Sequence, residues 1–197
     1  MTEHDVSDLS ARERGRLMKT AVSPRPIAWI STRSPDGVDN LAPFSAYNYV
    51  SSGEPVVSFS VPAGDRDELK DTVRNVLETG EFAVNVAAEA LAEEMDATSA
   101  SLEPDESEFD FAEVERAPCT TIDASRVADA PVTMECTLYG TMTVHDRLLT
   151  LGDVRHVHVD EAVQTDGQID ATKLETVARL GGPHYTDSDP IDLERQF

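Results

Sequence analysis

The sequence predicts a mainly β fold: a closed antiparallel barrel with two to three short peripheral helices. Short runs rich in β-branched and aromatic residues recur between turn signals, and few segments show helical spacing. Two longer runs, 132–144 and 148–159, face each other across a tight turn at His145–Arg147. The length of 197 residues favours one domain spanning 1–197, with enough chain to bury a core without disulfides or metals.

The first third of the chain predicts a helix and then three strands. Ser10 and Glu13 form a capping-box pattern, so a short amphipathic helix should follow and end before Pro24. The run 27–32 reads as a strand, and the turn signal Ser-Pro-Asp-Gly at 34–37 should return the chain antiparallel through 40–51. A third strand is expected at 56–61.

The remaining elements follow from the spacing of apolar residues, about 3.6 residues in helices and two in strands. A helix is predicted within 67–80, with Leu69, Val73, Val76 and Leu77 on one face and Gly80 as its C-terminal stop. A strand at 82–86 and a short helix within 87–99 come next, followed by an acidic surface excursion from 102 to 115. The glycine-rich segment 180–185 predicts a tight backbone path rather than a helix or a strand.

The charge balance restricts the partners. The chain has 38 acidic and 16 basic residues, a formal net charge of -22. A surface this negative repels nucleic acid at long range. The acids are spread along the chain and lysines are scarce, which favours adaptation to a high-salt cytoplasm, a halophilic origin, over an acidic interaction tail. No signal peptide and no membrane-spanning run are recognised, so we expect a soluble, cytoplasmic protein.

A neutral stretch interrupts this acidity. No charged side chain occurs from Asn40 to Gly53. Read as one strand, it places Ser45, Tyr47, Tyr49 and Ser51 on one face, and the next strand adds Ser58 and Ser60. Such a surface can approach a flat polar ligand and bond its rim. Ordinary strand serines bonded to the backbone are the alternative.

A phosphate contact is the second candidate. Lys70 and Thr72 stand at the start of the predicted helix, with Arg66 just before it. Helix N-termini carry unpaired amides and favour anions, and a lysine adds a charge-assisted bond. The alternative for Lys70 is an ordinary helix salt bridge, for example to Asp67.

Other chemistry lacks its signature. His156 and His158 share one face of a strand, but no third ligand is evident nearby, so no metal is predicted. Cys119 and Cys136 have no metal-ligand spacing and should be free thiols. No dinucleotide, P-loop or nucleophile-elbow motif is present, and no catalytic residue can be nominated.

Taken together, SPRPIAWIST, NLAPFSAYNYVSSGEPVVSFS, KDTVRNVLETGEFAVNV and RLGGPHYT resemble the flavin reductase-like family of FMN-binding split barrels. The resemblance covers 20–186, leaving a helical extension at 1–19 and a tail at 187–197. It implies an antiparallel split β-barrel of Greek-key type, a homodimer, bound FMN, and NADH or NADPH as the electron donor. The chemistry would then belong mostly to the cofactor, which explains the missing catalytic constellation.

The resemblance also implies roles for individual residues. The flavin ring would lie against 42–47, with Ser45 as the favoured contact; Ser51 and Ser60 would reach the ribityl chain or the phosphate. Lys70 and Thr72 would hold the phosphate, and His184 and Tyr185 would fold toward the ring. The expected FMN-binding residues are therefore Ala42, Pro43, Phe44, Ser45, Ala46, Tyr47, Ser51, Ser60, Lys70, Thr72, His184 and Tyr185.

Three functions remain open from sequence. The first is an FMN-dependent oxidoreductase that uses NAD(P)H to reduce flavin or another small acceptor. The second is a flavin-binding protein without turnover, which could supply a separate monooxygenase. The third is a barrel that serves only as a dimeric interaction module, which Lys70 and Thr72 argue against because such a module needs no phosphate contact.

Overall fold

The computed structural model describes residues 1–65, 69–191 and 193. Its α-helices are α1 (Ala11–Ala21), α2 (Asp71–Thr79), α3 (Ala92–Ala97) and α4 (Glu108–Phe111), with 3-10 turns at Val6–Asp8, Glu89–Leu91, Glu161–Val163 and Ala171–Lys173. Its strands are β1 (Arg25–Pro26), β2 (Ala28–Arg33), β3 (Asp39–Phe44), β4 (Tyr47–Ser51), β5 (Val56–Pro62), β6 (Glu81–Val86), β7 (Arg116–Pro118), β8 (Ser125–Val127), β9 (Val132–Val144), β10 (Arg147–Val159), β11 (Gln164–Thr165), β12 (Gln168–Ile169), β13 (Ala178–Arg179) and β14 (Tyr185–Thr186).

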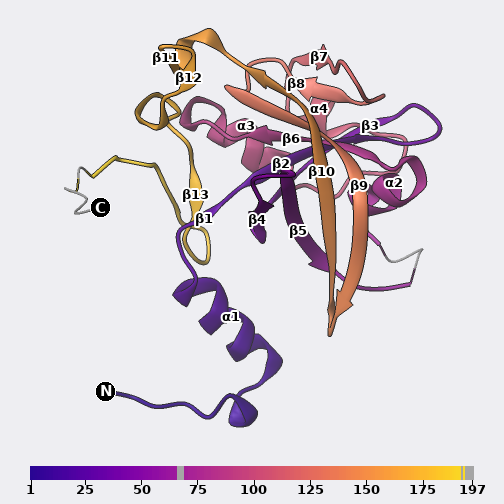
Figure 1. Cartoon of the computed structure of the whole chain (residues 1–197). Helices are drawn as coiled ribbons and strands as arrows, with labels where there is room; N and C mark the ends of the chain where they lie inside the picture. The colour runs from indigo at the N-terminus through magenta and orange to yellow at the C-terminus, as the bar shows by residue number, and fades with distance from the viewer. Residues whose placement is uncertain (66–68, 192, 194–197) are drawn as a thin grey trace.

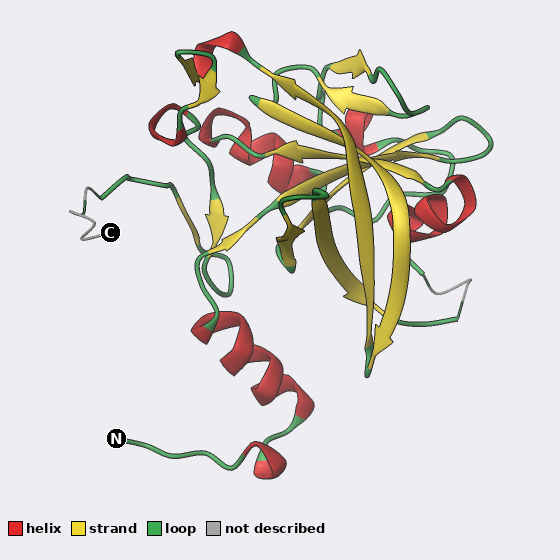
Figure 2. Ribbon diagram, viewed as in Figure 1, coloured by secondary structure: helices red, strands yellow, loops and turns green. Residues whose placement is uncertain are grey.

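A curved antiparallel sheet dominates the molecule (Figures 1 and 2). Its seven strands run in the order β3-β2-β6-β9-β10-β5-β4. The mainly β, antiparallel prediction is confirmed, but closure is not: among the described residues, no ladder of hydrogen bonds pairs β3 with β4. These two edge strands are joined through the chain instead, because β4 follows β3 after a bend at Ser45–Ala46. A second, three-stranded sheet joins β1, β13 and β14.

Both faces of the sheet are buried, which explains the continuous apolar run of β2. Ala28 and Ile30 point into a core that includes Phe59, Phe82 and helix α2. Trp29 points to the opposite core, formed with α3, α4 and β8; those buried members are Ile27, Trp29, Leu41, Ala87, Met95, Phe109, Val114, Val127, Ala130 and Val177. A strand covered on both faces does not alternate, since neither side chain direction meets water.

The two helices predicted before residue 81 both form, and in α2 one residue of the expected apolar face is exposed. Ser10 and Glu13 complete the capping box of α1, which contains no buried residue and lies apart from the sheet (Figure 1). In α2, Val73 and Val76 are buried, and Gly80 ends the helix in the left-handed region at φ 76°. Leu77, which was expected on the same face, is 43% exposed and lies at the edge of the buried side of the helix. No helix in the described ranges has the length and apolar character needed to cross a bilayer.

The acidic segment 102–115 is more than a surface excursion. It forms α4, whose Phe109 is 1% exposed and packs beside Trp29 and Leu41. Glu108 is also buried, and its Oε2 accepts hydrogen bonds from Asn40 Nδ2 at 2.8 Å and from the Leu41 amide at 3.0 Å. The sequence signal was weak because α4 has a single turn and its core contacts come from a distant strand.

The neutral stretch does not form the single strand expected at 40–51. It bends at Ser45–Ala46, so β3 pairs with β2 and β4 pairs with β5. Tyr47 and Tyr49 stand opposite Phe59 and Val57, whereas Ser58 stands opposite Asn48. The serines of β5 therefore do not share a face with the tyrosines of β4. Alternation alone cannot reveal this, because register depends on the partner strand.

Candidate functional site

Arg25 forms hydrogen bonds to the bend between β3 and β4 and to the end of α1. The Arg25 Nε donates to the Ser45 carbonyl at 3.1 Å, and its Nη1 donates to the carbonyls of Lys19 and Val22. These bonds tie the C-terminal end of α1 to the bend. The Ser60 amide donates to the Ala46 carbonyl at 2.9 Å from the other side. The backbone around Ser45 is thereby fixed between two elements that are distant in sequence.

A pocket of about 450 Å³ opens beside this bend. Among its described lining residues are four cations and no carboxylate, so we call it the cationic pocket. In a chain with a net charge of -22, such a lining favours an anion electrostatically. Its lining residues are Met18, Lys19, Val22, Arg25, Pro43, Phe44, Ser45, Ala46, Ser60, Val61, Pro62, Lys70 and Arg147.

Lys70 stands at the N-terminus of α2, on the rim of this pocket. It occupies the N-cap position without forming a side-chain cap, and its Nζ lies 5.7 Å from the centre of the Phe44 ring. Because the first amides of a helix have no intrahelical partner, this position offers N–H donors next to a positive charge. A helix salt bridge of Lys70 to Asp67 would involve a residue outside the described ranges, as would any role of Arg66.

A smaller pocket of about 200 Å³ adjoins the same helix end. It is walled on the far side by the uncharged segment 98–102, which follows α3. We call it the α2 pocket; its lining residues are Asn40, Ala42, Pro43, Lys70, Asp71, Thr72, Thr98, Ser99, Ala100, Ser101, Leu102 and Glu108. Lys70 lines both the α2 pocket and the cationic pocket.

Thr72 lies deeper than the sequence suggested. Its side chain is buried, and its Oγ1 donates to Asn40 Oδ1 at 2.7 Å. Asn40 in turn donates to Glu108, which forms a chain of bonds from helix α2 to helix α4. The single hydroxyl hydrogen of Thr72 is therefore already used within the protein, and only its oxygen lone pairs remain for a ligand.

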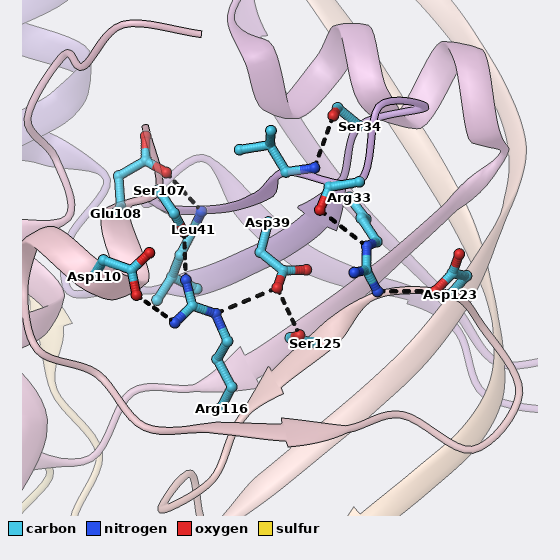
Figure 3. Close-up of polar contacts among 12 residues, drawn as sticks. Arg33, Ser34, Asp39, Leu41, Ser107, Glu108, Asp110, Arg116, Asp123 and Ser125 are labelled. Carbon is cyan, nitrogen blue, oxygen red and sulfur yellow. Dashed lines mark hydrogen bonds and ion pairs between the residues drawn. The ribbon is translucent and has the colours of Figure 1, made fainter. Parts of the chain in front are cut away.

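Arg116 fastens the acidic segment to β3 (Figure 3). Its Nη1 lies 2.7 Å from Asp110 Oδ1, and its Nε lies 3.3 Å from Asp39 Oδ2. The Arg116 hydrogen bond holds the pKa of Asp110 below its usual value. Figure 3 also shows Asp39 accepting from Ser125, at 2.9 Å, which joins β3 to β8. This network joins the acidic segment, β3 and β8.

The C-terminal segment borders a third pocket, of about 420 Å³. Tyr185 lines it and donates from its hydroxyl to Asp96 Oδ1 at 2.7 Å, while the Arg179 guanidinium lies 4.3 Å from the centre of its ring. Burial and the bond to Asp96 raise the pKa of Tyr185. Pro43 lines all three pockets, so they open around the C-terminal end of β3. His184 is exposed on the adjoining turn and lines none of the three.

Most of the sequence-predicted residues meet at these pockets. Those that line at least one pocket are Ala42, Pro43, Phe44, Ser45, Ala46, Ser60, Lys70, Thr72 and Tyr185. Tyr47 packs against the core instead, and burial raises its pKa to about 12. Ser51 lies at the far end of β4, beyond a bulge, and lines none of the three pockets. The binding roles of all twelve residues stay predictions.

Sequence reasoning missed three cations of this region. Lys19 comes from α1, Arg25 from β1 and Arg147 from the start of β10. The Arg147 Nη2 donates to the Ser60 carbonyl at 2.5 Å. One signal was available: Lys19 and Lys70 are two of only three lysines, the other being Lys173. No signal in the sequence could bring Arg147 beside Ser60, since that contact depends on the pairing of β10 with β5.

Comparison with known proteins identifies the family of this chain. Residues 19–173 match the family described as flavin reductase like domain. Protein YwrF of Bacillus subtilis is 39% identical over 188 residues, covering 91% of each chain. Nitrilotriacetate monooxygenase component B from Bacillus cereus has a similar structure, with a TM-score of 0.91, 30% identity and 98% of both chains covered. The 2-nitrobenzoate 2-nitroreductase NbaA of Pseudomonas fluorescens gives a TM-score of 0.89 at 29% identity, covering 98% of this chain and 96% of that one. The chain therefore belongs to the flavin reductase like domain family.

Proposed function

We propose that the protein is an FMN-binding oxidoreductase that takes electrons from NADH or NADPH and passes them to flavin or another small acceptor. The observation that carries this proposal is the cationic pocket: four cations beside a helix N-terminus, in a chain whose net charge is -22. FMN is an anion with a phosphate at one end, and helix N-termini and lysines favour phosphate. Membership of the flavin reductase like domain family supports the same ligand.

The residues present fit this cofactor. The phosphate would lie at the N-terminus of α2, where Lys70 supplies charge and the helix supplies amides. The ring would lie against the backbone of 42–46, where Ser45 is held by Arg25 and offers a small side chain for close approach. Ser60 and Tyr185 would border it. FMN, when bound, supplies the electron-transfer chemistry, and the protein binds, orients and shields it.

The test is an absorption titration. Purified protein is saturated with FMN, washed, and mixed without oxygen with NADH and then NADPH. Bleaching of the flavin band by either donor, followed by its return when an acceptor is added, is the expected result. Acceptors should include free flavin and a nitroaromatic compound, because a structural relative is a nitroreductase. Failure to retain FMN would overturn the proposal.

A carrier role is the second candidate. It is favoured by the likeness to a protein named as the B component of a monooxygenase. In this role the protein would bind FMN and supply a separate monooxygenase without turning over NAD(P)H. A flavin spectrum that neither donor bleaches would favour this candidate over the enzyme.

We also propose a homodimer in the cytoplasm of a cell with high internal salt. Exposed apolar side chains on β4 and β9 support self-association, since large apolar groups seldom face water together; they are Tyr49, Val50, Tyr139 and Met142. Sedimentation at several concentrations tests the dimer. The salt adaptation rests on the acidity alone, and a melting temperature that does not rise between dilute and concentrated salt would contradict it.

A further inference from the structure

Three side chains on β9 and β10 come together far from the cationic pocket. One ligand atom each from Glu135, His156 and His158 lies within 4.8 Å of the other two. The sequence showed only the two histidines, two apart on one strand. The third group is 21 positions before His156, and the pairing of β9 with β10 places it directly opposite that histidine.

A bulge in β10 creates this arrangement. Val154 pairs with Cys136, but His156, rather than Arg155, pairs with Glu135. Without the extra residue, His156 would stand opposite Met134 and point into the core that contains Cys136. With it, both histidines turn to the face of Glu135. Bulges often re-aim a side chain next to a functional site, at the cost of a broken ladder.

The carboxylate of Glu135 is held in place by the loop at 120–121. Its side chain is fully buried, yet its carboxylate accepts from the amides of Thr120 and Thr121, each at 2.6 Å, and from the Thr121 hydroxyl at 2.5 Å. A buried carboxylate held by three donors from one loop is therefore already oriented toward the two histidines.

The two histidines differ in their hydrogen bonds: His158 has a partner within the fold, whereas His156 has none among the described residues. His158 Nε2 lies 2.5 Å from Glu135 Oε1, a contact that a purely structural role would account for. His156 forms no hydrogen bond or ion pair with the described residues; its ring only packs edge to face on His158, with centres 4.9 Å apart. Its ring nitrogens are thus open to a ligand. Anchoring of the loop at 120–121 explains neither His156 nor the bulge.

We propose that Glu135, His156 and His158 form a binding site for a divalent transition-metal ion, with two imidazoles and one carboxylate as ligands. Two nitrogens and one oxygen suit Zn²⁺ and the neighbouring metals Co²⁺ and Ni²⁺, and water would complete the coordination. Metal binding would release the proton between His158 and Glu135 to solvent, and these two ligand atoms, 2.5 Å apart here, would move to about 3 Å apart so that both can bind the ion. The sulfur of Cys119, just before the loop, lies outside this three-atom cluster.

The site is separate from the proposed flavin site. His156 lies nine residues along β10 from Arg147 of the cationic pocket, which corresponds to about 30 Å of strand. Metal bound there would join β9, β10 and the loop at 120–121 and stabilise the sheet. It would not touch the flavin, so the proposal stands or falls independently of the proposed function.

Zinc titration of the full chain tests the proposal. The protein is treated with EDTA, dialysed, and titrated with ZnCl₂ in a calorimeter, with thermal unfolding measured alongside. We expect one tight site per chain and a higher melting temperature with zinc, since a ligand of the native state stabilises it. His156→Ala should weaken binding at least tenfold while keeping its circular dichroism, because that side chain forms no hydrogen bond or ion pair with the described residues and is not buried.

The control is another histidine at the tip of the β9–β10 hairpin. His145→Asn keeps a residue type that tolerates the φ of 52° there, and it should bind zinc as the natural protein does. Equal zinc affinity in His156→Ala, or no uptake by the natural protein, would overturn the site. A sulfur-to-metal charge-transfer band with Co²⁺ would also overturn it, because Cys119 would then be a ligand.

Discussion

Helix α2 separates two pockets of similar size and opposite charge. Its N-terminal end borders the cationic pocket of about 450 Å³, whereas its side borders an acidic pocket of about 500 Å³. Among its described lining residues, the acidic pocket has one cation, Arg74, and seven carboxylates: Asp36, Asp71, Glu78, Glu103, Asp105, Glu106 and Glu108. The acidic pocket matches the composition of the chain; the cationic pocket departs from it.

The difference shows that net charge describes the surface and says little about a site. Carboxylates that face water keep their hydration. At ordinary salt, dissolved ions largely screen the repulsion between carboxylates that are more than about 10 Å apart. Four cations gathered around one pocket must instead be brought there by separate elements, α1, β1, α2 and β10. A cluster of cations in an otherwise acidic chain is therefore a stronger sign of a binding site than the volume of a pocket is.

The largest expected effect comes from removing the lysine at the helix end. Lys70→Ala should weaken FMN binding by about 1–3 kcal/mol, the range for hydrogen bonds to charged groups. Fluorescence titration of FMN measures it. Arg74→Ala is the matched control, since it removes a cation from the same helix but on the side of the acidic pocket, where it pairs with Asp71. Equal losses in the two variants would erase the distinction between the pockets.

One carboxylate of the acidic pocket should matter for stability rather than for binding. Glu108→Ala leaves the Leu41 amide and the Asn40 side chain without their acceptor, which should lower the free energy of unfolding by about 1–3 kcal/mol. Urea unfolding followed by circular dichroism measures the change. Asp105→Ala, an exposed neighbour in the same pocket, should change it by less than about 0.5 kcal/mol. A loss as large for Asp105→Ala would remove the special role of Glu108.

The salt dependence of FMN association should distinguish long-range repulsion by the acidic surface from short-range attraction by the cationic pocket. Between about 0.05 and 0.5 M salt, the rate of FMN association should rise about two- to tenfold, because screening weakens the repulsion by the acidic surface. Stopped-flow fluorescence gives this rate. A rate that falls with salt would mean that the cationic pocket already dominates the approach of the ligand.

The smallest effect is expected in the acidic pocket itself. Asp36→Asn removes one exposed charge there and should change FMN affinity by less than about 0.5 kcal/mol, as is usual for surface charges. The same titration used for Lys70→Ala measures it. A larger gain in affinity would indicate that the acidic pocket repels the ligand directly and that the two pockets act as one site.

The sequence by itself determined the longer strands outside the neutral stretch and the helices α1, α2 and α3, because these depend on local periodicity and turn chemistry. The 13-residue strands β9 and β10 have almost the predicted bounds, and the capping box of Ser10 forms as expected. The resemblance also identified part of the lining of the cationic pocket, namely Pro43 to Ala46, Ser60 and Lys70. Lys70 and Ser45 are cases in which a local signal and the site coincide.

Only the tertiary structure decided what lies beside what. The bend at Ser45–Ala46 exists because β3 and β4 bind different partners, and Arg147 reaches Ser60 because β10 pairs with β5. Glu135 joins His156 because a bulge shifts one strand by one residue. These contacts are set by register between distant segments, a property of strand pairs that no single segment carries.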